Sequence, residues 1–396
     1  MASILSNHST LLEAPATPRE LANILAEAAA SGNAITPVGG GSKLAFGNPL
    51  SRDTIKLSTA KLNRVLAYEP DDMTLSVEAG ATMASVWQTL AERGLTIPID
   101  VPLPESETIG GLIATGLCGP RRYGSGSLRD ALIGIQAAYP DGTLGNAGGM
   151  VVKNVSGFDL MRMHLGALGT LGVVVSANFK LVPAARAEAT VLVERATFDQ
   201  LEGDRLAIHV GRIRPIAYES RRTGDHWTES IRIEGRPATV DQMARELADR
   251  LGDATLLSRD ESRQFWNGYV RTEAIPTDPE LLTLQVRGRP TEISATTTAA
   301  LSAFADSIED IRASPGLGTV RLVVRSGAAR SGDHINAIAE LRASGRSVLL
   351  LSAPQAVHAG VEAFGTPESN LELMRQLKRQ FDPWSALNPG RVIPEL

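Results

Sequence analysis

Three glycine-rich segments carry the residue types that could bind an anion through the main chain. The first is the run Gly39-Gly40-Gly41-Ser42-Lys43, which directly follows an expected strand over residues 34–38. Successive glycines let the backbone bend until several N–H groups point to one side, and such a nest suits a phosphate. Ser42 and Lys43 would add a hydroxyl and a cation. The run has neither the Walker spacing nor a G-x-G-x-x-G pattern, and a plain glycine turn is an equally good interpretation.

The second segment spans residues 104–119 and contains an expected helix start. Thr108, Gly110 and Gly111 lie at that start, where free N–H groups and the positive end of the helix dipole favour a second phosphate. The third segment, Gly166–Val174, places bare backbone at the entry to an apolar strand, against which a flat aromatic ring could lie. Tight helix–sheet packing and a turn before a buried strand use the same small residues, so both alternatives stay open.

Hydrophobic periodicity supplies the elements that would position these segments. Thr17, Pro18 and Glu20 predict a helix start, with Thr17 as N-cap and Glu20 completing a capping box. Up to residue 182 we expect strands at 34–38, 54–57, 64–68, 73–78, 131–139, 143–145 and 171–182, and helices at 18–32, 82–93, 108–117 and 158–165. Thereafter glycine is sparse, and we expect strands at 230–234, 282–287, 319–325 and 347–352, and helices at 240–251, 291–308, 334–343 and 367–381. This alternation fits an α+β sandwich.

Composition narrows the class of protein. A formal net charge of -5 argues against a nucleic-acid binder. Cys118 is the one cysteine, which excludes an intrachain disulfide and a cysteine-ligated zinc or iron–sulfur site. No apolar run reaches about 18 residues, and residues 1–20 lack a secretory pattern. We therefore expect a cytoplasmic protein with no transmembrane segment and no nucleic-acid partner.

Four motifs and a C-terminal signature occur in the order found in one known family. They are P-V-G-G-G-S-K at 37–43, T-I-G-G and C-G-P-R-R-Y-G within 108–124, V-K-N-V-S-G-F-D-L at 152–160, G-T-L-G-V-V at 169–174, and L-N-P-G-R at 387–391. Over residues 15–185 and this tail, the chain resembles the vanillyl-alcohol-oxidase/PCMH-type FAD-binding family. The ordered set is far more specific than any one of its motifs.

The resemblance implies an α+β fold in three parts. These are a PCMH-type FAD-binding domain of two α/β subdomains at 1–185, an α+β cap or substrate domain at 186–355, and a C-terminal helix and tail at 356–396 that packs on the FAD domain. It also implies which residues bind FAD: Pro37, Val38, Gly39, Gly40, Gly41, Ser42 and Lys43 at the pyrophosphate; Pro104, Thr108, Gly110, Gly111, Thr115, Gly116 and Cys118 beside the isoalloxazine and ribityl chain; Gly169, Thr170, Gly172 and Val173 at the adenine; and Asn388, returning toward the flavin.

Departures from the family pattern limit what it implies about chemistry. Members with covalent flavin carry a histidine in the first loop, and residues 37–43 contain none, so we predict non-covalent FAD. The H-x-G-D-G-N-x-H metal motif of related D-2-hydroxyacid dehydrogenases is absent, and we predict no metal. Those relatives also place an arginine before the lysine of the K-x-N run, whereas Val152 precedes Lys153 here.

Oxidation of a 2-hydroxy acid needs cations for the carboxylate and a flavin N5 to take the hydride. Arg121, Arg122 and Lys153 are the candidate carboxylate partners, and a solvated surface charge is the alternative for each. His209 lies in the apolar stretch Ala207–Val210, which we expect to be a strand. A hydrogen-bonded core histidine is then a better interpretation than a catalytic base.

Two functional hypotheses follow. In the first, the chain is the FAD-binding subunit of an oxidase or dehydrogenase of glycolate or another 2-hydroxy acid. It passes electrons to a second flavin subunit and an iron–sulfur subunit, through which any membrane association would run, because it has no thiolates for its own cluster. In the second, it is a structural or electron-transfer flavin subunit without a substrate site. A MurB-like reaction with NADPH shares the fold, which does not fix function, and no additional feature favours it.

Overall fold

The computed structural model describes residues 11–12, 14–150, 159–211, 213–365 and 369–394, and these divide into two compact units. The first unit comprises Met1–Leu117, Ser127–Ala184 and Thr366–Leu396, and the second comprises Cys118–Gly126 and Ala185–Gly365. The division after Ala184 lies next to the boundary expected at 185/186. Two stretches fall elsewhere than expected: residues 118–126 and 356–365 both group with the second unit.

The first unit contains two main sheets and a small strand pair. One sheet is parallel, with the order β1 (Leu11–Leu12), β3 (Ile55–Ser58), β2 (Ile35–Val38). The other is antiparallel, with the order β4 (Val65–Glu69), β5 (Thr74–Glu78), β9 (Val173–Lys180), β7 (Leu132–Ala138), β8 (Leu144–Gly148); β6 (Leu95–Thr96) pairs with β10 (Val182–Pro183). The helices are α1 (Pro18–Ala30), α2 (Met83–Ala91), α3 (Ile109–Thr115), α5 (Leu128–Ala131), α6 (Met161–His164) and α13 (Leu371–Phe381).

Helix α1 forms where its capping signals predict. The Thr17 hydroxyl accepts a hydrogen bond from the Glu20 amide at 3.2 Å, and the Glu20 carboxylate accepts from the Ala16 amide at 2.8 Å. In a full capping box the Glu20 carboxylate would accept a hydrogen bond from the amide of the N-cap Thr17, whereas here it accepts from the amide of the preceding Ala16. Leu21 and Leu25 on one face of the helix are buried with Ile35 and Leu57 of the parallel sheet.

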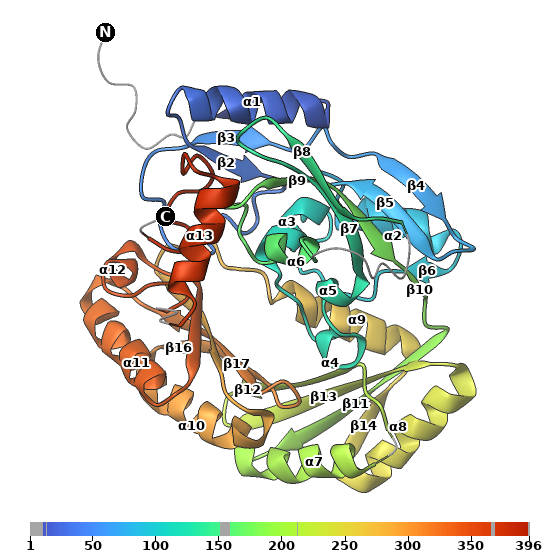
Figure 1. The fold of residues 1–396 in the computed structure, drawn as a ribbon. Coiled ribbons are helices and arrows are strands. Elements are labelled where there is room, and N and C mark those ends of the chain that lie inside the picture. The colour runs from blue at the N-terminus through green and yellow to red at the C-terminus, as the bar shows by residue number, and fades with distance from the viewer. Residues whose placement is uncertain (1–10, 13, 151–158, 212, 366–368, 395–396) are drawn as a thin grey trace. The chain divides into compact units, whose positions relative to one another are not determined.

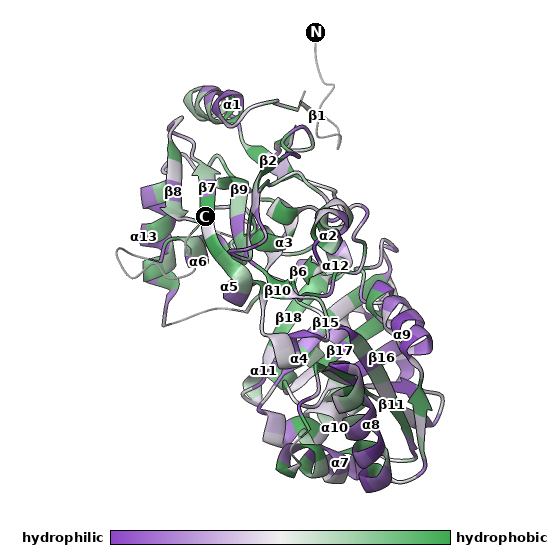
Figure 2. Ribbon diagram, turned by 90° about the vertical axis from the view of Figure 1, so that its right-hand side faces the viewer, coloured by the Kyte–Doolittle hydropathy of each residue, from purple (hydrophilic) through white to green (hydrophobic). Residues whose placement is uncertain are grey.

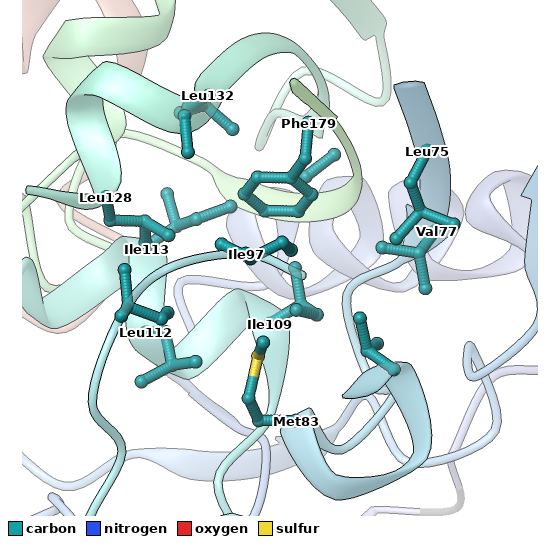
Figure 3. Close-up of a cluster of buried hydrophobic side chains, with 14 of the residues drawn as sticks. Leu75, Val77, Met83, Ile97, Ile109, Leu112, Ile113, Leu128, Leu132 and Phe179 are labelled. Atoms are coloured by element: carbon teal, nitrogen blue, oxygen red, sulfur yellow. The ribbon is translucent and has the colours of Figure 1, made fainter. Parts of the chain in front are cut away.

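The core of the first unit lies between the antiparallel sheet and helices α2 and α3. Figure 3 shows Leu75, Val77 and Phe179 of the sheet facing Met83 of α2 and Ile109 of α3. Each such side chain contributes about 1.5–3 kcal/mol when fully buried. This packing fixes α3 on the sheet, and a glycine in its first turn permits the close approach: a Cβ at Gly110 would lie 3.0 Å from the Cβ of Ala79.

The C-terminal segment packs beside β2. Asn388 donates its amide to the Ile35 carbonyl at 3.0 Å, and Ile35 donates to Ala386 at 2.7 Å. A buried ion pair fixes this segment, because Lys378 Nζ lies 2.7 Å from Asp382 Oδ2 and also donates to two carbonyls. Residues 386–391 are thereby brought next to the loop that follows β2.

The second unit is built on one antiparallel sheet of eight strands. The order is β14 (Ala254–Leu257), β11 (Ala187–Arg195), β13 (His226–Gly235), β12 (Ala217–Thr223), β16 (Ile308–Ser314), β17 (Thr319–Arg325), β15 (Leu281–Arg287), β18 (Ser347–Ser352). Its helices are α4 (Arg122–Ser125), α7 (Phe198–Val210), α8 (Pro237–Leu251), α9 (Arg259–Arg271), α10 (Ile293–Phe304), α11 (Ser331–Ala343) and α12 (Gln355–His358), with short 3-10 turns at Pro290–Glu292, Ala305–Ser307 and Ala328–Arg330.

The two faces of this sheet are covered by different helices. Tyr218 of β12 packs in a cluster with α8, whereas the adjacent Ala217 packs with Trp266 and Tyr269 of α9. Successive strand residues point to opposite faces, so α9 lies on the face opposite α8. Figure 1 shows α7, α8, α10 and α11 along one face, and α9 with α4 on the other. Hydrophilic residues cover much of α8 and α9 (Figure 2), as expected of helices with one solvent-facing side.

The α+β prediction is confirmed, but several elements of the second unit were missed. Strands β11, β12, β14 and β16 and helices α7 and α9 were not expected. The strand predicted at Ala207–Val210 is wrong: those residues end helix α7, and His209 is exposed on it rather than buried in a core. The expected helix at 158–165 is shorter, and the start of the expected helix at 367 lies outside the described residues.

Candidate functional site

A pocket in the first unit brings together the loop after β2, the start of α3 and the C-terminal segment. It is lined by Thr36, Pro37, Gly39, Gly40, Gly41, Ser42, Lys43, Leu44, Phe46, Glu107, Thr108, Gly111, Ala114, Thr115, Leu168, Asn388 and Arg391. The first and second predicted segments therefore meet at one site with Asn388. Thr36 and Arg391 were not predicted to belong to it.

The loop of residues 39–43 presents unused main-chain donors. Within the part of the chain that the structure describes, none of these five amides donates a hydrogen bond to another residue. The loop packs closely against the segment before α3. A Cβ at Gly40 would lie 1.6 Å from the Ser106 carbonyl oxygen, and one at Gly39 would lie 2.1 Å from Thr108 Oγ1. Gly41 has a φ of 78°, which favours glycine. Free N–H groups on a bend of this kind suit an anion.

Lys43 does not supply a free positive charge to the pocket. Its ammonium group forms an ion pair with Glu107, whose side chain is only 2% exposed. Burial lowers the pKa of Lys43 below its usual value, and the interaction with Glu107 opposes that shift. The pair joins the loop after β2 to the segment before α3, so it shapes the pocket without adding net charge.

Arg391 is a cation without a carboxylate partner among the described residues. One of its nitrogens donates to the Asn48 carbonyl at 3.0 Å, and Asn48 in turn donates its amide to the Arg391 carbonyl. Burial lowers the pKa of Arg391. A half-buried cation of this kind is stabilised by an anionic ligand.

Asn388 adds a side-chain acceptor to the pocket. Its Nδ2 donates to the Leu168 carbonyl at 2.7 Å, while its Oδ1 is buried and accepts no hydrogen bond from the residues that the structure describes. Its backbone has a φ of 42°, a conformation that asparagine tolerates better than most residues. A buried acceptor left unpaired costs about 1–3 kcal/mol, so a ligand N–H or O–H at this atom would be favourable.

The amides at the start of α3 are not free. Ile109 donates to Ala81, Gly110 to Ala79 and Gly111 to the Thr108 hydroxyl. The prediction of free N–H groups at this helix start is therefore wrong, and the alternative of tight helix–sheet packing accounts for Gly110. Thr108, Gly111 and Thr115 still line the pocket, whereas Pro104, Gly116 and Val38 are not among its lining residues.

Most residues of the third predicted segment do not line the pocket. Gly169, with a φ of 68°, lies beside Asn388 and Pro37, because a Cβ there would be 3.4 Å from Asn388 Nδ2. Gly172 packs against Tyr139 and His164, and Val173 is buried in β9. Thr170 belongs to a separate apolar cavity of about 230 Å³ beside α13.

The three candidate partners for a substrate carboxylate differ in their environments. Arg121 forms a two-pronged ion pair with Glu234, at 2.6 and 2.7 Å, and is therefore already neutralised. Arg122 is exposed on α4 and has no ion-pair partner among the described residues. Lys153 lies outside the described residues. Cys118, predicted beside the flavin, groups with the second unit.

These features suit a nucleotide cofactor with an anionic bridge. Among the described residues, the pocket offers main-chain donors, a cation not balanced by an acid and a buried acceptor, so it can hold a phosphate together with a polar ring or hydroxyl. The described residues contain no cluster of three His, Cys, Asp or Glu side chains that could bind a metal ion. Among the described helices, none has the length and apolar character needed to cross a bilayer.

Two family models match the chain. The FAD binding domain model matches residues 10–158, and the model for the C-terminal domain of FAD linked oxidases matches residues 365–392. Together these ranges contain most of the pocket, including the loop 39–43 and both Asn388 and Arg391.

Similar proteins cover nearly the whole chain. Glycolate oxidase subunit GlcE of Escherichia coli (strain K12) is 26% identical over 90% of this chain and 92% of its own length. D-lactate dehydrogenase of Archaeoglobus fulgidus is 27% identical over 96% of this chain and 91% of its own. Among solved structures, an alkyldihydroxyacetonephosphate synthase aligns with a TM-score of 0.73 at 16% identity, covering 96% of this chain and 75% of that one. This last likeness shows the fold alone.

Proposed function

We propose that this chain, which matches the FAD binding domain model over residues 10–158 and the model for the C-terminal domain of FAD linked oxidases over residues 365–392, uses FAD as its cofactor and is the flavin subunit of an oxidase or dehydrogenase of glycolate or a related 2-hydroxy acid. The observation that supports FAD binding at the pocket is the set of five amides in residues 39–43, next to Arg391, which donate to no other residue of the described chain. Support for the substrate class comes from the names of the relatives, a glycolate oxidase subunit and a D-lactate dehydrogenase, which match over nearly their full length.

In this proposal the residues of the pocket bind and orient the cofactor. The amides of the loop 39–43 and Arg391 would hold the pyrophosphate, and Asn388 Oδ1 would accept a hydrogen bond from the cofactor. FAD supplies a ring that accepts a hydride. No histidine occurs in the loop 39–43, so the binding we propose is non-covalent.

In this proposal the two units have different binding functions. The first unit, together with the C-terminal segment, would bind FAD, and the second would bind substrate. Electrons would leave through partners, because the chain contains a single cysteine and cannot hold an iron–sulfur cluster of its own. We propose a second flavin subunit and an iron–sulfur subunit as those partners. The complex would be cytoplasmic, with any membrane association carried by the partners.

One observation favours a second candidate function. Arg121, which could have bound a substrate carboxylate, is occupied by Glu234. A flavin subunit that relays electrons without oxidising a substrate itself would tolerate this loss.

Anaerobic addition of glycolate or D-lactate to the purified FAD-loaded chain separates the two functions. Bleaching of the oxidised flavin band at about 450 nm, a property of the cofactor, supports the oxidoreductase with its own substrate site. No bleaching by either acid, with FAD demonstrably bound, supports the relay. Acid precipitation tests the mode of attachment, since non-covalent FAD passes into the supernatant and a yellow pellet contradicts the proposal.

A further inference from the structure

We propose that Arg287 and Arg122 form a carboxylate-binding subsite in the second unit, which takes the carboxylate of a small 2-hydroxy acid. The inference rests on the proposed function for the identity of the acid, but the subsite itself is argued from the second unit alone. Arg287 ends strand β15, and Arg122 begins helix α4 in the segment Cys118–Gly126.

The segment that carries Arg122 is held firmly on the second unit. Arg121 is paired with Glu234 of β13 through both of its terminal nitrogens. The Gly124 amide donates to the Ile216 carbonyl at 3.1 Å, and a Cβ at Gly124 would lie 2.6 Å from the Pro215 carbonyl oxygen, so the backbones touch. These contacts fix the position of α4, and with it the base of the Arg122 side chain.

The same segment meets the end of the sheet at which Arg287 lies. The Tyr123 ring packs on Gly316 in the β16–β17 turn, where a Cβ would lie 2.0 Å from Tyr123 Cε2. Gly318 of that turn accepts a hydrogen bond from the amide of Gly288, the residue after Arg287, at 2.9 Å. Arg122 and Arg287 therefore approach from a helix and a strand that share one turn.

Arg287 lacks an acidic partner among the described residues. Its Nη2 donates to Gln285 Oε1 at 2.8 Å, and its direct neighbours across the sheet are Thr319 and Ser347, which are uncharged. Burial lowers the pKa of the Arg287 guanidinium, and the charge of Arg122 lowers it further, whereas Cys118 raises it. Among the described residues, no carboxylate contributes to this shift.

Two buried arginines on this sheet are paired with acids, whereas Arg287, within the described residues, is not. Arg232 contacts Glu188 and Glu234, and Arg312 contacts Asp310 at 2.6 Å. Two neighbouring guanidinium groups without an acid repel each other, and an anion between them removes that repulsion. Because guanidinium matches carboxylate in its planar fork geometry, and Gln285 orients one fork, a carboxylate is the anion that fits.

The test uses the full-length chain loaded with FAD and two ligands. Oxalate has a carboxylate but no C–H bond from which a hydride could leave, so calorimetric titration with oxalate measures the subsite without turnover. Arg122→Gln and Arg287→Gln should each raise the Kd for oxalate by about 10- to 100-fold, the loss expected for a charge-assisted hydrogen-bonded pair. Arg287→Lys should lie between Arg287→Gln and the unaltered chain, because it keeps the charge and loses the fork.

Arg289→Gln is the matched control. Arg289 lies two residues after Arg287, is 81% exposed and is near Glu292, so its replacement should leave the Kd unchanged. Circular dichroism and FAD content show whether each variant is folded. If Arg287→Gln fails to fold, the Kd of Arg122→Gln for oxalate still tests the subsite. Arg122 is exposed and has no ion-pair partner among the described residues, so its replacement should leave the fold intact.

Flavin reduction by glycolate distinguishes failure of this inference from failure of the proposed function. Suppose that glycolate does not bleach the flavin, but oxalate binds with an affinity that both arginine variants weaken. The carboxylate subsite is then supported, and the proposed oxidation of substrate by this chain is contradicted. If glycolate bleaches the flavin with the same concentration dependence in both arginine variants, the oxidation stands and the subsite is overturned. Absence of oxalate binding to the unaltered chain also overturns the subsite.

Discussion

Replacement of Gly40 by alanine tests whether the loop 39–43 is a built anion site. The ideal Cβ of residue 40 would lie 1.6 Å from the Ser106 carbonyl oxygen and 2.6 Å from its carbonyl carbon. Contacts under 3.0 Å are not tolerated by a Cβ, so the gap must open by 1.4 Å, from 1.6 to 3.0 Å. The obstacle is backbone, fixed on α3 and its neighbouring segment, and it cannot rotate away. The loop must therefore move instead.

A shift of this size removes the loop amides from hydrogen-bonding range. N–H···O distances span only about 2.7–3.2 Å, so a displacement beyond 1 Å breaks the bonds that the amides would make to a pyrophosphate. Hydrogen bonds to a charged group contribute about 1.5–3 kcal/mol each. Loss of two of them corresponds to about 3–6 kcal/mol, a fall in FAD affinity of about 100-fold or more. The side chain would act by displacing the loop, not by entering the phosphate position.

The assay is the Kd of FAD for the stripped protein, followed by flavin fluorescence or calorimetry. Gly203→Ala is the matched control, because a Cβ there meets nothing within 4 Å and the residue lies exposed in α7. Thermal unfolding of both variants separates loss of FAD affinity from loss of the fold. Retention of the original FAD affinity by a folded Gly40→Ala protein would refute the assignment of this loop.

Three other perturbations test the pocket and its supports. Arg391→Gln should weaken FAD binding by about tenfold or more, measured as the Kd, because it removes a cation without an acid partner among the described residues; an unchanged Kd would place the pyrophosphate elsewhere. Lys378→Met should lower the free energy of unfolding by about 3–5 kcal/mol in urea titrations, because it leaves Asp382, which is fully buried, without its charge partner; a loss below about 1 kcal/mol would contradict this. Burial lowers the pKa of His164 to about 4, from about 6.5 in the unfolded chain. The unfolded chain therefore binds an extra proton between these values, and the unfolding free energy should fall by about 3 kcal/mol as the pH drops from about 6.5 to 4, with the full contribution retained above pH 6.5. His164→Gln should flatten this dependence in urea titrations at several pH values, whereas replacement of the exposed His209 should not.

The predictions from sequence succeed where the information is local. The glycines of the loop 39–43 predicted a bend with free N–H groups, and in the structure these amides donate to no other described residue; that they bind a phosphate stays a prediction. Helix α1 followed from the equally local signals of Thr17, Pro18 and Glu20. A comparable local signal was missed at α7, where Thr197 and Gln200 form a capping box before the residues that we expected to be a strand. A four-residue apolar run cannot by itself distinguish the two structures.

The predictions fail where a partner is distant in the sequence. The amides at the start of α3 are used by Ala79 and Ala81, about thirty residues earlier, and nothing near Gly110 indicates this. The division of the chain is a second case. Residues 118–126 follow α3 directly, yet the ion pair between Arg121 and Glu234 and the packing of Tyr123 on Gly316 place them in the second unit.

The balance of charge in the pocket is the property that a motif conveys least well. The loop motif suggested Lys43 as the cation for a phosphate, because it is adjacent to the glycines. In the folded chain Glu107 neutralises it, and the unbalanced cation is Arg391, which comes from the C-terminal segment through contacts with Asn48. A glycine run thus identifies where an anion can approach the main chain. Which side chain neutralises that anion depends on ion pairs between residues far apart in the sequence. The protonation state of each buried group is determined by all the charges and hydrogen bonds around it.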